Sequence, residues 1–77
     1  DAGNKSVMYI TGLVRNTSSE TFEQVELVFV LYDQQGGKLG ESMDFTMKLG
    51  PNKEWAFRAP CMFTNVARAD LGRVVVR

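Results

Sequence analysis

The chain has 77 residues, of which 44% are hydrophobic, and its nine basic and nine acidic side chains give a net charge of zero. We expect a single domain covering residues 1–77, because a chain of this length has no room for a second core. The balanced charge argues against a general role on nucleic acid or on a membrane surface. Cys61 is the only cysteine and histidine is absent, which excludes an intrachain disulfide and an ordinary zinc site.

The first expected strand covers residues 7–15, where apolar and polar side chains alternate. Gly12 lies inside this strand, which indicates a close approach by a neighbouring element. A polar break follows at residues 16–19. Asn16-Thr17-Ser18 matches the N-glycosylation pattern, but an asparagine that forms a turn is the simpler interpretation.

The second expected strand covers residues 22–32 and is the anchor of the fold. Thr21 and Gln24 imitate a helix capping box, but the β-branched and aromatic residues of this run favour a strand. Residues 34–37, Gln-Gln-Gly-Gly, then predict a hairpin turn. We expect Asp33 to accept hydrogen bonds from the backbone amides of that turn. Phe29 and Leu31, on one face, are expected to be core residues.

Residues 42–49 show the most regular alternation of the chain. It predicts one buried face, formed by Met43, Phe45, Met47 and Leu49, and one wet face. Gly50-Pro51-Asn52 predicts a turn, because proline fixes φ and asparagine tolerates a left-handed conformation.

A further strand is expected to place Trp55 and Phe57 inside and to end at Pro60, with Cys61 buried. The last strands are expected at residues 66–69 and 73–77, with residues 70–72 forming a hairpin turn or a bulge. Six or seven short antiparallel strands without a helical window predict an all-β, two-sheet sandwich with Ig-like connectivity. A small closed barrel is the structural alternative.

A run of five residues carries a resemblance to a known family. Phe-Val-Leu-Tyr-Asp at residues 29–33 resembles the F-x-L-Y-D signature of the FxLYD domain. The strand at residues 10–16 before it, and the Leu-Gly-Pro turn at residues 49–51 followed by Phe57 after it, resemble motifs that occur in the same order in that family. Asn52 stands where that family usually has glycine. The resemblance implies an Ig-like sandwich of secreted or envelope-anchored bacterial and archaeal proteins, with no established catalytic activity. The matching positions are Gly12, Asn16, Phe29, Leu31, Tyr32, Asp33, Pro51 and Phe57.

The residue inventory offers no catalytic site. A serine or cysteine nucleophile lacks a histidine base, and no glycine-rich loop precedes a helix. Asp33, Glu41 and Asp44 lack the dense spacing of a calcium site, so we expect solvated carboxylates and no cofactor. No apolar stretch is long enough to cross a membrane as a helix, which predicts no membrane insertion. Because the chain begins with Asp1, we interpret it as a mature fragment or an excised domain, and we expect its leader or anchor to lie outside this chain. The resemblance to the FxLYD domain implies a location outside the cytoplasm.

One feature of the sequence indicates binding. On the second face of the central strand, Val28, Val30 and Tyr32 form a row that is more apolar than a solvated face requires. We expect this row to contact a neighbouring domain, a second copy or another protein, unless side chains of the same sheet cover it. The chain is interpreted as a non-catalytic interaction or spacer module of a larger secreted or envelope protein. The alternative is a periplasmic peptide-binding or inhibitor-like module that uses a sheet edge.

Overall fold

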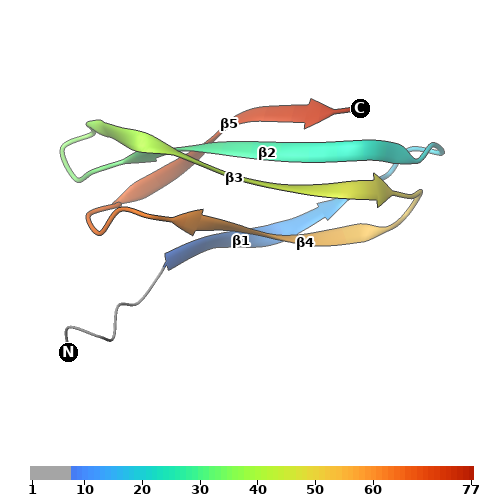
Figure 1. The fold of residues 1–77 in the computed structure, drawn as a ribbon, viewed down its shortest axis with the longest axis horizontal. Helices are drawn as coiled ribbons and strands as arrows, with labels where there is room; N and C mark the ends of the chain where they lie inside the picture. Colours follow the sequence, from blue (N-terminus) through green and yellow to red (C-terminus); the bar gives the residue numbers. More distant parts are fainter. Residues whose placement is uncertain (1–7) are drawn as a thin grey trace.

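The computed structural model describes residues 8–77, which form five β-strands and no helix. All strand pairs are antiparallel: one sheet pairs β1 with β4, and the other has the order β3-β2-β5 with β2 at its centre. Figure 1 shows the three-stranded sheet above the β1–β4 pair. The expected all-β fold with two antiparallel sheets is confirmed. The strands are β1 (Met8–Arg15), β2 (Phe22–Tyr32), β3 (Lys38–Leu49), β4 (Glu54–Cys61) and β5 (Arg68–Val76).

The described residues contain five strands where the sequence predicted six or seven, because β5 is continuous. Leu71 lies opposite Phe29 and Arg73 lies opposite Val28, so Gly72 is the extra residue of a β-bulge. A Cβ atom at Gly72 would stand 2.9 Å from Cγ2 of Val30, which explains the glycine. The bulge alternative for residues 70–72 is therefore confirmed, and the hairpin alternative is wrong. Residues 66 and 67 belong to the preceding loop.

The core lies between the two sheets. Leu27 and Phe29 of β2 pack against Ala59 of β4, and Trp55 and Phe57 of β4 are packed against this cluster. The rings of Phe29 and Phe57 stack with their centroids 5.5 Å apart. The predicted inward positions of these aromatic residues are confirmed. Burial of each large apolar side chain stabilises such a core by about 1.5–3 kcal/mol.

The prediction that four alternating side chains of β3 are buried is wrong for three of them. Met43, Phe45 and Met47 are 44%, 51% and 57% exposed, and they lie on the face of the sheet that turns away from β1 and β4. Leu49 alone is buried. Lys48, which precedes it, has a φ of 56°, and a residue in this left-handed region interrupts the regular alternation of a strand.

The inward positions of β3 are polar because they bind the backbone edge of β4. The buried hydroxyl of Ser42 donates a hydrogen bond to the carbonyl of Pro60, and Oδ2 of Asp44 accepts one from the Arg58 amide at 2.8 Å. Pro60 lies inside β4 and does not end it, contrary to the prediction. A proline is tolerated at such a position because the outer edge of a strand needs no ladder donor.

The turns have the predicted chemistry. Oδ1 of Asp33 accepts hydrogen bonds from the amides of Gln35 and Gly37 at 2.9 and 2.8 Å, and Gly36 has a φ of 83°. In the β3–β4 turn, Asn52 has a φ of 60°, which is the left-handed conformation expected there. The hairpin turn between β2 and β3 and the turn that joins β3 to β4 in the other sheet both follow from local sequence.

Gly12 and Asn16 have separate structural roles at β1. A Cβ atom at Gly12 would stand 2.7 Å from Cζ of Phe57, so the predicted close approach is confirmed. Asn16 is 1% exposed, and its Nδ2 donates to the carbonyls of Glu20 and Leu49 at 2.7 and 2.9 Å. Because both amide hydrogens are used inside the fold, the structure favours the turn interpretation over glycosylation of Asn16.

Candidate interaction surface

Within residues 8–77, one face of the three-stranded sheet has no second sheet packed over it. We define the outer face as this face, which is turned away from β1 and β4. Strand pairing places its side chains in rows across β3, β2 and β5, because residues directly opposite each other point to the same side. From one end to the other, the rows are Met47 and Gln24; Phe45, Glu26 and Val75; Met43, Val28 and Arg73; Glu41, Val30 and Asp70; and Lys38, Tyr32 and Arg68.

One end of the outer face is charged, and its charges pair within the chain. Lys38 lies 3.5 Å from Glu41, and Arg68 lies 3.3 Å from Asp70. The guanidinium of Arg68 also lies over the Tyr32 ring, 4.4 Å from its centroid. This end is therefore solvated and internally satisfied, and exposed ion pairs of this kind contribute little to binding.

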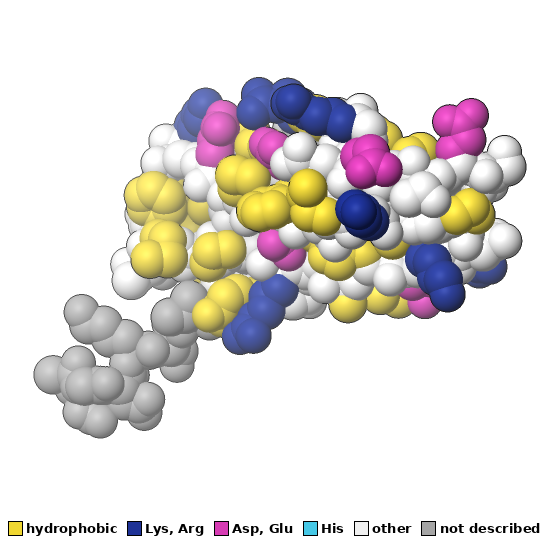
Figure 2. Space-filling model, turned by 45° about the vertical axis from the view of Figure 1, so that its right-hand side comes forward, with side chains coloured by type: hydrophobic (Ala, Val, Ile, Leu, Met, Phe, Trp, Pro, Cys, Tyr) yellow, Lys and Arg dark blue, Asp and Glu magenta, His cyan; other side chains and the backbone are white. Residues whose placement is uncertain are grey.

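The other end is apolar and open to solvent. We define the apolar patch as six side chains of this face: Val28, Val30, Met43, Phe45, Met47 and Val75. Its most exposed members are the three residues of β3, while Val28 is buried at its centre. A shallow hollow lies above Val28, bordered by Glu26, Glu41, Met43 and Arg73. In Figure 2, hydrophobic side chains lie open to solvent with basic and acidic side chains around them.

The structure separates the three residues that the sequence singled out for interaction. Val28 and Val30 lie in the apolar patch, whereas Tyr32 lies at the charged end beneath Arg68. Sequence reasoning missed Met43, Phe45, Met47 and Val75 as members of this surface. The signal was present in the period-two pattern of residues 43–47, but that pattern was assigned to the core.

A second apolar surface lies along β5. Leu71, Val74 and Val76 are 54%, 50% and 47% exposed, although they point to the inner side of the sheet. Their direct partners on β2 are buried: Phe29 lies opposite Leu71, Leu27 opposite Val74 and Val25 opposite Val76. Among residues 8–77, no strand pairs with the outer edge of β5 or of β1. The core therefore ends at β2, and the inner side of β5 is left partly open.

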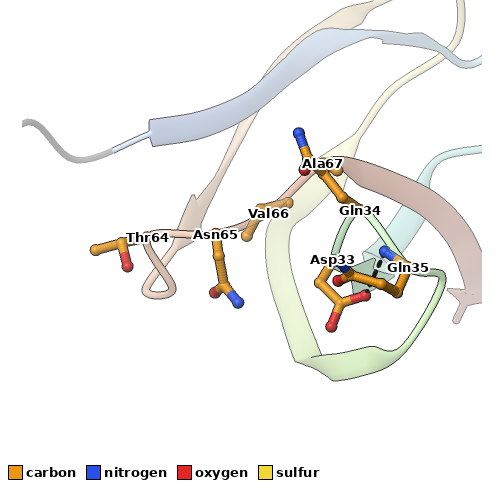
Figure 3. Close-up of a pocket in the computed structure, with 7 residues that line it drawn as sticks. All are labelled: Asp33, Gln34, Gln35, Thr64, Asn65, Val66 and Ala67. Carbon is orange, nitrogen blue, oxygen red and sulfur yellow. Dashed lines mark hydrogen bonds between the residues drawn. The ribbon is translucent and has the colours of Figure 1, made fainter.

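A polar depression lies at the end of the molecule between the β2–β3 turn and the β4–β5 loop. Residues 33–35 line one side of it and residues 64–67 line the other, as Figure 3 shows. Asp33 is oriented by the turn amides through the hydrogen bond drawn to Gln35. The depression holds one carboxylate without a second acid or a base beside it, so it has no pair for acid–base chemistry.

The titratable groups of residues 8–77 are either dispersed or used in hydrogen bonds within the fold. No three Cys, Asp or Glu residues among 8–77 gather as metal ligands do. The Cys61 thiol is buried, as predicted. Asp33 and Asp44 are used as hydrogen-bond acceptors for backbone amides. Residues 8–77 also contain no helix of the length and apolarity that a membrane crossing requires.

Comparison of this chain with protein-family models, with curated proteins and with solved structures finds no match. The resemblance to the FxLYD domain therefore stays a prediction that depends on residues 29–33 and their flanks.

Proposed function

We propose that this chain is a non-catalytic, Ig-like interaction module of a larger secreted or cell-envelope protein, and that it binds its partner through the outer face. The Ig-like assignment is supported by strand pairing. In Ig domains, strand B pairs with E in one sheet and strand C pairs with F in the other. The pairs β1–β4 and β2–β5 have the same order along the chain, and β3 then occupies the place of an added strand beside C.

The observation that carries the binding role is the exposure of Met43, Phe45 and Met47 beside Val28 and Val30. Apolar side chains gathered on one sheet face, with charged groups at the border, are typical of a protein interaction surface. Phenylalanine and methionine are also enriched in interface cores. On the outer side of the β1–β4 sheet, by contrast, the exposed Leu13 stands between a row formed by Thr11 and Arg58 and a row formed by Arg15 and Glu54.

The extracytoplasmic location rests on the resemblance of residues 29–33 to the FxLYD signature. A spacer role is compatible with the same fold, but a spacer needs no exposed apolar patch. The absence of histidine from the sequence supports a non-catalytic role, because the commonest general base is missing.

The proposal is tested by photo-crosslinking in the cells that produce the full-length protein. Benzoylphenylalanine replaces Phe45 in one variant and Leu13 in a control variant. Leu13 is 68% exposed on the outer side of the β1–β4 sheet. We expect a discrete protein adduct from position 45 and at least about fivefold less from position 13. Equal adducts from the two positions, or none from position 45, would contradict the proposal.

A second candidate function is capture of an extended peptide by strand addition. The half-exposed inner side chains Leu71, Val74 and Val76 favour it, because they lie beside unpaired strand edges. In Ig topology, the free edge of β1 corresponds to the place of strand A, and that of β5 to the place of strand G. Adducts from benzoylphenylalanine at Val74, with none at Phe45, would select this candidate over the first.

A further inference from the structure

The outer face is complementary to itself in charge. Glu26 and Arg73 lie in adjacent rows beside the apolar patch, on neighbouring strands. Within residues 8–77, no salt bridge joins either of them to another side chain, in contrast to the charges at the other end of the face. The apolar end thus presents one acidic and one basic group that are free to pair with a partner. A copy of the same chain carries the matching set.

The outer face is also complementary to itself in shape. Phe45 stands out from the row of Glu26, and the hollow above Val28 lies in the next row. A two-fold axis that runs in the plane of the face between these rows exchanges them. Phe45 of each copy then lies over Met43 of the other, at the border of the hollow, and Glu26 of each copy lies over Val28 of the other, one strand spacing from Arg73 of that copy and within reach of its long side chain. Such reciprocal contacts are what a two-fold interface requires.

We propose that the outer face binds a second copy of this chain, forming a two-fold symmetric dimer with two reciprocal Glu26–Arg73 ion pairs around the apolar patch. This inference rests on the proposed function and names the partner for the same surface. A second copy supplies a basic group for Glu26 and an acidic group for Arg73, neither of which forms a salt bridge within residues 8–77.

The size of the patch predicts a weak dimer. Three strands about 4.8 Å apart and about eight residues long cover roughly 14 by 27 Å, or on the order of 400 Å² for each copy. The two copies together would bury about 800 Å², which is less than the roughly 1,000 Å² that a stable interface reaches, so only a transient dimer is consistent with this area. We therefore expect a dissociation constant on the order of 100 µM, with faster exchange than an obligate dimer shows.

The test uses charge exchange and sedimentation equilibrium of the 77-residue chain from about 20 µM to about 1 mM. We expect the unchanged chain to dimerise, and the variants Glu26→Arg and Arg73→Glu each to weaken the dimer more than about tenfold, because like charges then face each other. The double variant E26R/R73E restores the opposite charges and returns the dissociation constant to within about threefold of the original. Leu13→Asp, on the other sheet, leaves it unchanged.

A mixture of the two single variants gives the sharpest result. Glu26→Arg chains and Arg73→Glu chains, each monomeric alone, are complementary at both ion pairs and should form a heterodimer when mixed. Circular dichroism of each variant confirms that it is folded. A monomer at every concentration, or a mixture that stays monomeric while both chains are folded, would overturn the proposed dimer. A crosslink from position 45 to a different protein would also overturn it, while leaving the proposed function standing.

Discussion

The two faces of the central sheet are both apolar, yet they have opposite roles. The inner row of β2, represented by Leu27 and Phe29, packs against β1 and β4, whereas Met43 and Phe45 on the outer face of β3 are open to solvent. Hydrophobicity does not distinguish the two. What distinguishes them is the polar pair Ser42 and Asp44, which fixes the inward side of β3 by hydrogen bonding to β4. These two contacts, one partly buried and one exposed, thus favour the orientation of β3 in which Met43 and Phe45 face solvent.

The largest expected effect is the difference in unfolding free energy between a substitution on the inner face and one on the outer face. Leu31 is 0% exposed, so Leu31→Ala should lower the free energy of unfolding by about 2–5 kcal/mol through lost burial and a residual cavity. Met43→Ala on the outer face should lower it by less than about 1 kcal/mol. Urea denaturation followed by tryptophan fluorescence measures both. Equal losses at the two positions would mean that the outer face is covered in the folded chain.

The next effect tests the buried asparagine that joins the turns at one end of the two sheets. Asn16→Ala removes the donors to Glu20 and Leu49 and leaves their carbonyls without these partners, so it should cost about 1–3 kcal/mol. The exposed neighbour substitution Thr17→Ala should change the free energy of unfolding by less than about 0.5 kcal/mol. If both substitutions leave the free energy of unfolding in urea unchanged, the hydrogen bonds of Asn16 to Glu20 and Leu49 do not stabilise the fold.

A loss of stability of similar size is expected when a methyl group is added at Gly12, on the inner side of β1. Gly12→Ala places a methyl group 2.7 Å from the Phe57 ring, and overpacking of this kind costs about 1–3 kcal/mol. Gly50→Ala meets only ordinary contacts at 3.6 Å and serves as the matched control, with an expected change below about 0.5 kcal/mol. Thermal unfolding compares the two. A stable Gly12→Ala variant would show that the sheets pack less closely here than the structure indicates.

The smallest effect concerns the contact that selects the inward side of β3. Asp44→Ala removes the acceptor for the Arg58 amide and should cost about 0.5–1.5 kcal/mol, with faster hydrogen exchange at that amide. Asp44→Asn keeps an acceptor oxygen and should retain most of the protection. Unchanged exchange at Arg58 in Asp44→Ala would remove this explanation for the orientation of β3.

The sequence predicted well those features that depend on neighbouring residues. The hairpin after Asp33 and the left-handed Asn52 follow from local turn chemistry, and the strand character of residues 22–32 follows from β-branched composition. Gly12 was also interpreted correctly as a point of close approach, because a glycine inside an alternating strand has few other causes.

The features that depend on distant pairing could not be predicted in the same way. Alternation in residues 43–49 shows which side chains share a face, but it does not say which face another sheet covers. From the sequence, Ser42 and Asp44 are expected to be solvated, because their hydrogen bonds to β4 form only in the complete fold. For this reason the apolar patch was assigned to the core, and only its β2 members, Val28 and Val30, were identified as a surface.

The most direct test of the two-faced sheet is methionine oxidation in the folded chain, read by mass spectrometry. Met62, which is 77% exposed in the β4–β5 loop, is the internal reference, and a concentration of about 5 µM keeps a weak dimer dissociated. The account predicts that Met43 and Met47 are oxidised at rates within about threefold of the Met62 rate, before any unfolding. Protection of both residues by more than about tenfold would contradict it, because these side chains would then lie in a core.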